Sequence, residues 1–165
     1  RDAQPSCKVE VLIPDLRGDD ALRAVMDAGP DVLNHNIETV ERVFHRVRPK
    51  GDYRRSLRLL ARAREMAPHI PTKSGMMVGL GEIEEEVHAT MRDLLDSGCQ
   101  LLTIGQYLRP SRVHFPLQRF YHPEEFDALR RMGEEMGFAH VASGPRVRSS
   151  YLADEQAAAA KVLGP

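Results

Sequence analysis

Five short polar clusters carry the side chains of this sequence that could bind or transform a ligand. They are Asp15-Leu16-Arg17-Gly18, Asn34-His35-Asn36, Gly79-Leu80-Gly81-Glu82, Gln106-Tyr107 and Ser143-Gly144-Pro145. The amides and the imidazole of the second cluster could fix the hydroxyl or carboxylate groups of a small polar ligand. They could also cap the next helix, with His35 hydrogen-bonded inside the protein. The residue types leave both interpretations open.

Two further segments have one functional and one structural interpretation each. Glycines between Gly75 and Glu82 could serve packing, or could let a ligand approach the backbone; the segment lacks the Gly-x-x-x-x-Gly-Lys-Ser/Thr pattern of a P-loop. Lys73 could be a Schiff-base nucleophile. Because it comes at the start of its strand, on the structural side of parallel folds, we discount that role.

Basic residues near the end of the chain also allow two interpretations. The stretch Arg146–Tyr151 could be a solvated surface or an anion site in which arginines and hydroxyls meet a phosphate. A second group interleaves arginines with aromatic residues, as in nucleic-acid patches, and comprises Arg109, Arg112, Phe115, Arg119 and Tyr121. The net charge of −1 argues against nucleic acid as a partner.

Alternating strands and helices must position these clusters. Apolar runs predict strands over 8–16, 31–36, 72–80, 101–107 and 138–143. Helical spacing predicts helices around 22–26, from Ile37 onward, around 53–60, over 83–95 and over 123–136. This alternation predicts an α/β fold with a parallel sheet. All five polar clusters then lie at the carboxyl ends of the strands, the edge that carries active sites in such folds.

The composition indicates an ordinary globular chain. Its 165 residues are 42% hydrophobic, which suits a single domain. No apolar run reaches the roughly 20 residues of a membrane span, and the amino-terminal residues show no signal core. Cys7 and Cys99 are too few for a disulfide framework. We therefore expect a soluble, cytoplasmic protein, with Cys99 buried between a helix and a strand and Cys7 ahead of the first strand.

Six blocks in consecutive order resemble the lipoyl synthase family of radical S-adenosylmethionine (SAM) enzymes. They are Leu12–Gly18, Val32–Thr39, Pro71–Glu82, Leu102–Ser111, His140–Pro145 and Arg148–Ala153. The resemblance covers about Val9 to Ala153. It implies that residues 1–153 form the C-terminal part of a partial TIM-type (β/α) barrel, ending in the Arg-Ser-Ser-Tyr-x-Ala motif. Residues 154–165 would be a terminal tail.

The resemblance implies insertion of sulfur into a protein-bound octanoyl chain to make the lipoyl cofactor. One [4Fe-4S] cluster would cleave SAM to a radical, and a second, auxiliary [4Fe-4S] cluster would donate the sulfur. The implied partners are octanoylated lipoyl domains or carrier proteins, such as 2-oxoacid dehydrogenase E2 components and the glycine cleavage H protein, together with a reductant protein. Neither nucleic acid nor membrane is implied.

The resemblance also assigns roles to single residues, none of them certainly catalytic. The expected SAM-binding residues are Asn34, His35, Asn36, Glu38, Gly75, Met77, Gly79, Glu82, Gln106 and Tyr107. Ser150 is the expected ligand of the auxiliary cluster, with Ser149 as second choice; an oxygen ligand is unusual there because thiolates normally hold such clusters. Arg146 and Arg148 would support the cluster or the substrate. Met77 replaces a usual isoleucine and Leu152 a frequent histidine.

The cluster cysteines of the family would precede the blocks seen here, and Cys7 and Cys99 cannot replace them. We therefore expect a fragment that is inert by itself. The alternatives are a degenerate paralogue, a carrier-protein binding module without catalysis, and an aldolase-like barrel that uses Lys73.

Overall fold

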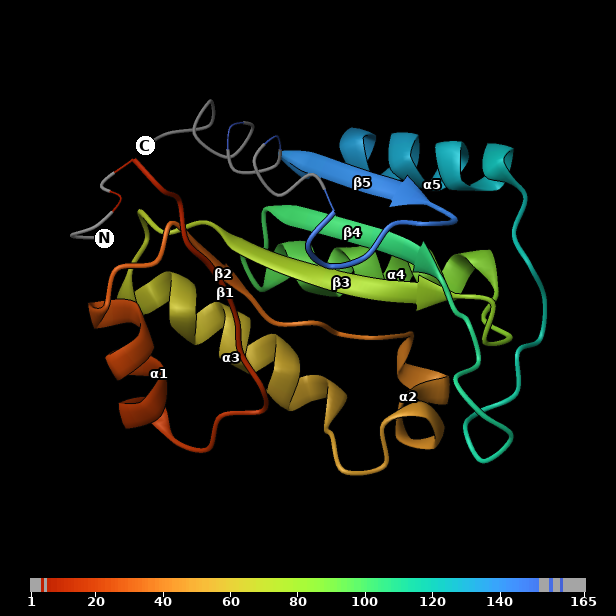
Figure 1. Ribbon diagram of the computed structural model, residues 1–165, viewed down its shortest axis with the longest axis horizontal. Helices are drawn as coiled ribbons and strands as arrows, with labels where there is room; N and C mark the ends of the chain where they lie inside the picture. The colour runs from red at the N-terminus through yellow and green to blue at the C-terminus, as the bar shows by residue number, and fades with distance from the viewer. Residues whose placement is uncertain (1–3, 5, 152–154, 156–157, 159–165) are drawn as a thin grey trace.

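The computed structural model describes residues 4, 6–151, 155 and 158, and its chain alternates strands with helices (Figure 1). The strands are β1 (Glu10–Leu12), β2 (Val32–Asn34), β3 (Thr72–Val78), β4 (Leu101–Gln106) and β5 (His140–Gly144). The helices are α1 (Asp19–Asp27), α2 (Glu41–Val47), α3 (Tyr53–Met66), α4 (Glu84–Asp96) and α5 (Pro123–Met136).

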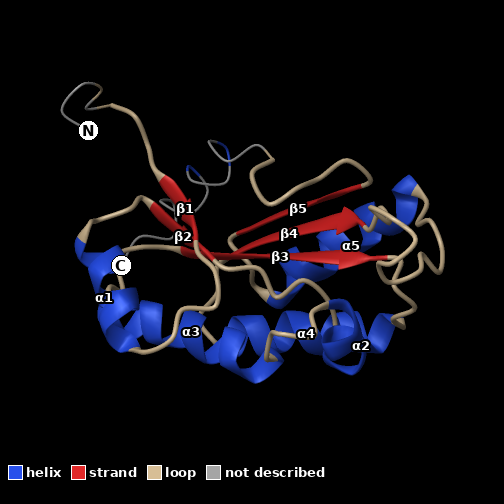
Figure 2. Ribbon diagram, turned by 60° about the horizontal axis from the view of Figure 1, so that its bottom comes forward, coloured by secondary structure: helices blue, strands red, loops and turns tan. Residues whose placement is uncertain are grey.

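The five strands form one parallel sheet in the order β1-β2-β3-β4-β5. Helices cover one face of this sheet (Figure 2). The α/β prediction is therefore confirmed, and the arrangement is that of a partial barrel. Because every strand runs in the same direction, the five polar clusters of the sequence lie at or just beyond the carboxyl ends of the strands, as predicted.

Strand alternation divides the sheet residues between its two faces. Leu102 and Ile104 of β4 face the helices and are fully buried in the larger core cluster, which joins β3, β4 and β5 to α2, α3, α4 and α5. Leu33 of β2 belongs to a second cluster with α1 and α3. The intervening positions Lys73, Gly75 and Thr103 therefore face the other side of the sheet.

Two predicted boundaries differ from the structure. The first strand was expected to be long and buried, but β1 has three residues and Leu12 is 57% exposed. Among the described residues β1 is an edge strand, so no further strand lies beside it. The side chain of Leu12 points away from the helices and is therefore left uncovered. The second helix was expected from Ile37 but starts at Glu41, because the backbone of Glu38 pairs with Met76 of β3 instead.

Helix ends follow local chemistry. Asp52 caps α3 by accepting a hydrogen bond from the backbone N–H of Arg55 at 2.6 Å. Pro123 occupies the first turn of α5, where its missing N–H costs nothing, and Gly137 ends that helix in the left-handed conformation.

The tail predicted for residues 154–165 lies outside the described residues except for 155 and 158, so the boundary at 153 stays a prediction. Among the described residues, no helix is both long enough and apolar enough to span a bilayer.

Candidate functional site

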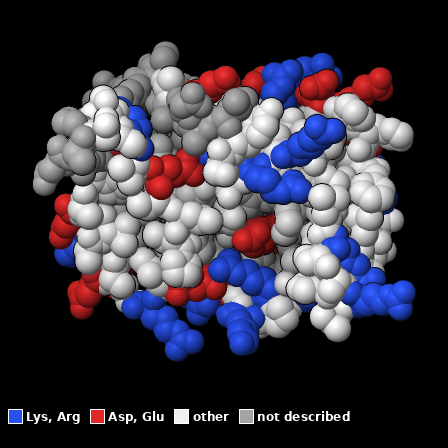
Figure 3. All heavy atoms as spheres, viewed as in Figure 1, with Lys and Arg blue, Asp and Glu red and all other residues white. Residues whose placement is uncertain are grey.

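A cavity of about 220 Å³ lies at the carboxyl ends of the strands. Its walls come from the residues after β2, from β3, from the end of β4 and from the segment after β5. The lining residues are Asn36, Glu38, Gly75, Met76, Met77, Thr103, Gly105, Gln106, Leu108, Val147, Arg148 and Ser149. On the face seen in Figure 3, acidic atoms lie near the middle, with basic side chains gathered above and below them.

The turn after β2 brings Asn36 and Glu38 to the cavity. Glu38 has a φ of 69°, a left-handed conformation that costs a residue with a side chain roughly 1 to 2 kcal/mol. Two backbone hydrogen bonds hold it there: its N–H donates to Gly75 O at 3.0 Å, and its carbonyl accepts from Met77 N at 2.8 Å. Strained residues held by their surroundings cluster at functional sites.

The charge of Glu38 depends on its surroundings. Burial raises the pKa of its carboxyl, whereas the guanidinium of Arg48 and a hydrogen bond from the Asn36 side chain lower it. Asp15 raises the pKa by its negative charge, as the smallest of these effects. Burial has the largest effect, so the carboxyl takes up a proton at a higher pH than an ordinary glutamate does.

Gly75 leaves the cavity floor open. A Cβ atom at this position would lie 2.7 Å from Asn36 Oδ1 and 2.8 Å from Thr103 Oγ1, closer than such atoms can approach. Asn36 Oδ1 is itself buried without a hydrogen-bond partner within the described residues. A buried acceptor without a partner costs free energy until a donor reaches it, so the floor suits a ligand that donates hydrogen bonds.

The segment after β5 closes one side of the cavity. It passes so near β4 that a Cβ atom at Gly105 would lie 2.3 Å from Val147 O. This approach brings Arg148 and Ser149 to the cavity wall, whereas Ser150 is exposed and is not part of the lining. Arg146 is also exposed and lines a separate groove along β5. Of the Arg-Ser-Ser-Tyr-x-Ala motif, Leu152 and Ala153 lie outside the described residues.

Asn34, the last residue of β2, does not line the cavity, and its side chain is hydrogen-bonded to another residue of the chain. Its Nδ2 donates to Glu10 Oε1 at 2.9 Å, and Lys73 Nζ lies 3.0 Å from Glu10 Oε2. The Lys73 side chain is fully buried, and its burial lowers the pKa of the amine. Because Lys73 is paired with Glu10 at the start of β3 and is not among the residues that line the cavity, the structure gives no support to a Schiff-base role for it.

His35 is held by protein groups on both ring nitrogens and does not line the cavity. Nδ1 lies 3.1 Å from Ile13 O, and Nε2 lies 3.0 Å from Ser56 Oγ. Since a carbonyl can only accept, Nδ1 carries the proton and Nε2 accepts from the serine. Burial lowers the pKa of the ring, which favours this neutral form. Of the two interpretations of His35 that the sequence allowed, the structure agrees with a histidine hydrogen-bonded inside the protein.

Gly79, Glu82, Gln106 and Tyr107 mainly anchor loops. Glu82 accepts hydrogen bonds from the backbone N–H groups of Gly79 and Leu80 at 2.7 and 2.8 Å. Gln106 Nε2 donates to Val78 O and Arg119 O, each at 3.2 Å. These contacts pin the loop that follows β3 and the long loop that follows β4. Gln106 also lines the cavity, whereas the other three do not.

The two cysteines lie apart from the cavity lining. Cys7 is exposed, and burial raises the pKa of the Cys99 thiol to about 12, so Cys99 stays a buried neutral thiol as expected. Within the part of the chain that the structure describes, no group of three or more His, Cys, Asp or Glu side chains is placed to hold a metal ion.

Several lining residues were missed by reasoning from the sequence. Met76, Thr103, Gly105, Leu108 and Val147 line the cavity, and Arg48 supports its turn by pairing with Asp15 of the first polar cluster. The alternation of β4 could have identified Thr103 and Gly105, since they share the face of Gly75 in the neighbouring strand. Nothing in the sequence indicates that Arg48, at the end of a helix, pairs with Asp15.

Comparisons with known proteins identify the family of the chain. Residues 2–94 match the model of the radical SAM superfamily. The chain is 56% identical to the lipoyl synthase of Nitrosococcus oceani over 165 residues, which are 99% of the chain and 51% of that protein. It is 58% identical to the lipoyl synthase of Rubrobacter xylanophilus over 153 residues, 92% of the chain and 48% of that protein.

A third relative, the lipoyl synthase of Syntrophotalea carbinolica, is 59% identical over 152 residues, 91% of the chain and 49% of that protein. The chain thus spans about half the length of the curated relatives it matches. The chain belongs to the radical SAM superfamily and is a homologue of its lipoyl synthases.

Proposed function

We propose that this chain is the C-terminal part of an enzyme that inserts two sulfur atoms into an octanoyl chain carried on a protein lysine. The observation that carries the proposal is the cavity at the carboxyl ends of β2 to β5, in a chain that is 54% to 59% identical to lipoyl synthases. This edge is where parallel α/β folds place their active sites.

The residues at the cavity fit SAM, the cofactor that the family implies. Asn36 Oδ1 and the Glu38 carboxylate would accept hydrogen bonds from its hydroxyl or amino groups. Met77 would contact the adenine, and Gly75 leaves the room that any side chain would fill. When bound and cleaved, SAM supplies a carbon radical that removes hydrogen from unactivated carbon atoms. Gln106 would contact SAM without hydrogen-bonding to it, because its amide is already hydrogen-bonded to backbone groups.

The described residues do not offer a full set of cluster ligands, so the proposal assigns the cysteine ligands of both iron–sulfur clusters to sequence outside this chain. One oxygen ligand of the auxiliary cluster would come from the serine pair. We chose Ser150 from the sequence, but Ser149 lines the cavity while Ser150 is exposed, and this position favours Ser149. Arg148 lines the same wall and could support a negatively charged cluster.

The substrate in this proposal is an octanoylated lipoyl domain or carrier protein, and a reductant protein would supply electrons to the cluster. Leu108 lines the cavity and is 53% exposed, so an acyl chain from a separate protein could reach the cavity along this apolar side chain. A cytoplasmic setting belongs to the same proposal.

The proposal is tested with the coding region that precedes this chain and with the protein it encodes. We expect two sets of cysteines upstream, and we expect the complete protein, reconstituted without oxygen, to release 5′-deoxyadenosine from SAM. The isolated chain is the control, and it should form no stable cluster and no 5′-deoxyadenosine. A start codon next to Arg1 would instead indicate a degenerate paralogue or a binding module. Cluster formation and SAM cleavage by the isolated chain would contradict the proposed division of ligands.

A further inference from the structure

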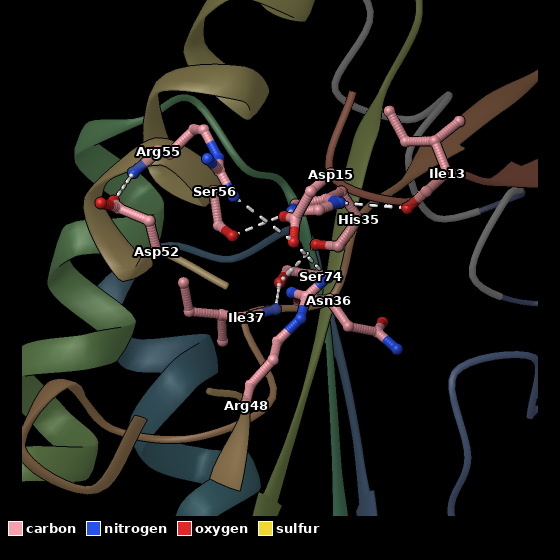
Figure 4. Close-up of polar contacts among 10 residues, drawn as sticks. All are labelled: Ile13, Asp15, His35, Asn36, Ile37, Arg48, Asp52, Arg55, Ser56 and Ser74. Carbon is pink, nitrogen blue, oxygen red and sulfur yellow. Dashed lines mark hydrogen bonds and ion pairs between the residues drawn. The ribbon is translucent and has the colours of Figure 1, made fainter. Parts of the chain in front are cut away.

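A partly buried network of charged residues, Asp15, Arg48 and Arg55, lies beside Asn36 (Figure 4). Asp15, in the loop after β1, has a side chain that is 20% exposed. Its Oδ2 lies 2.9 Å from Arg48 Nη2 and 3.7 Å from Arg55 Nη2. Arg48 follows the last residue of α2, and its Nη1 donates to Asn36 O at 3.4 Å. The network therefore connects the loop after β1 to the backbone of the cavity turn.

The neighbouring His35 does not compete for the charge of Asp15. Its Nε2 lies 3.6 Å from Asp15 Oδ1, but burial lowers the pKa of the ring, and in the neutral ring this nitrogen accepts the Ser56 hydroxyl proton. Asp15 Oδ1 consequently has no hydrogen-bond partner among the described residues. The two guanidinium groups are then the cations that stabilise the Asp15 carboxylate, and Arg48 is the nearer of them.

We propose that Asp15 and Arg48 are a pair of positioning residues that presents Asn36 and Glu38 to the cavity ligand. Asp15 fixes the Arg48 guanidinium, and Arg48 fixes the carbonyl of Asn36. Neither residue lines the cavity, so both act through the turn rather than on the ligand. This inference rests on the proposed function only in naming SAM as the ligand; the positioning of Glu38 can be measured without any ligand.

The pair also sets the charge of Glu38. The charged and titratable groups around that carboxyl are Arg48 at the end of α2, Asp15 after β1 and Arg148 after β5; the β3 and β4 residues of the lining are uncharged. Burial raises the pKa of Glu38, and among the effects that lower it the charge of Arg48 is the largest. Loss of Arg48 should therefore raise that pKa further.

The first experiment measures the pKa of Glu38 directly. In the complete protein labelled with carboxyl-13C glutamate, the Glu38 resonance is identified by its loss in Glu38→Gln, and its titration is followed by NMR. Arg48→Gln should raise the pKa, Arg48→Lys should keep it close to the wild-type value, and Arg62→Gln should not change it. Arg62 is a matched control because it also pairs with carboxylates, those of Asp19 and Glu65, but away from the cavity lining. An unchanged pKa in Arg48→Gln would overturn the inference.

The second experiment measures SAM binding between pH 5 and 8. In the wild type, binding should fall when Glu38 becomes protonated at low pH. In Arg48→Gln the fall should begin at a higher pH, so that binding within that range is weaker than in the wild type. Asp15→Asn should weaken binding at every pH, and the double variant should bind no more weakly than Arg48→Gln alone, because the two residues act as one unit.

The outcomes separate the two proposals. A wild-type protein that does not bind SAM would refute the proposed cofactor and leave the NMR result to decide the positioning role. A fall in melting temperature with an unchanged pH profile and additive effects of the two substitutions would show a purely structural ion pair, and would overturn the inference. If Arg48→Gln does not fold, Arg48→Lys and Asp15→Asn still decide between these outcomes through the affinity at neutral pH.

Discussion

Glu38 and Gly75 show how single residues make room for a ligand. The left-handed backbone of Glu38 turns the chain so that Asn36 and Glu38 both reach the cavity, and hydrogen bonds to Gly75 and Met77 compensate its strain. Gly75 serves twice, because its carbonyl accepts from Glu38 and its missing side chain opens the floor. A pattern of residue types can reveal the glycine, but the conformation of Glu38 emerges only from pairing between distant segments.

Gly75→Ala should weaken SAM binding by about fivefold or more. The added methyl would crowd Asn36 Oδ1 and Thr103 Oγ1, and overpacking a tight site typically costs about 1 to 3 kcal/mol. Isothermal titration of the complete protein measures the affinity. Gly133→Ala is the matched control, since its Cβ would crowd Val141 just as closely but outside the cavity lining. It should reduce stability and leave affinity unchanged; equal affinity of Gly75→Ala and wild type would refute the assigned site.

His35 should make the protein less stable in acid. Its burial lowers the pKa below the ordinary value of 6.5, so the unfolded chain binds a proton that the folded chain resists. Stability is then fully present above about pH 6.5 and falls as the pH drops below it, by at most about 1.4 kcal/mol per pH unit for one proton. Urea unfolding at pH 5, 6 and 7 should show a shallower slope in His35→Gln than in the wild type.

The control is His45→Gln, an exposed position on α2, which should keep the slope of the wild type. Identical slopes in wild type and His35→Gln would contradict the neutral, buried ring.

At this scale the sequence placed Asn36, Glu38, Gly75, Met77 and Gln106 where the cavity lies. It could not separate Ser149 from Ser150, because the difference depends on how the chain leaves β5 and crosses Gly105.

At the scale of elements, periodicity predicted every helix and strand because most of them bury one clear face. Helices α3, α4 and α5 carry apolar stripes that pack on the sheet, and their bounds lie close to those predicted. The predicted bounds were less accurate where contacts with a neighbouring strand determine them. The strand β1 is short because it lies at the edge of the sheet, and α2 begins late because Glu38 pairs with β3. The loop from Leu108 to His122 has no periodicity from which its course could be inferred.

Gln106 holds that loop against the sheet. Its amide donates to Val78 O and Arg119 O, and its Oε1 accepts from Tyr121 N at 2.9 Å. Gln106→Leu should therefore release the loop, and hydrogen exchange should become faster at the amides of Tyr121 and Gln118. Gln118→Leu is the control, because among the described residues its exposed side chain donates a hydrogen bond within the loop, to Pro116 O. Unchanged exchange in Gln106→Leu would show that other contacts hold the loop.

At the scale of the whole molecule, one parallel sheet gathers residues from the entire chain at a single edge. The cavity combines residues between Asn36 and Ser149, and no local motif contains them all. The parallel topology could be predicted from the alternation of elements, and the topology in turn predicts the edge. The sequence could not supply the ion pair between Asp15 and Arg48, which depends on how the loop after β1 packs beside the end of α2.

The most direct test of the proposed activity is the mass of an octanoylated lipoyl domain after incubation with the complete protein, SAM and a strong reductant without oxygen. We expect a product with two added sulfur atoms at the octanoyl chain, formed together with 5′-deoxyadenosine, and less product with Gly75→Ala when SAM is held near the dissociation constant of the wild type. A complete protein that cleaves SAM but leaves the octanoyl domain unchanged in mass would contradict the account.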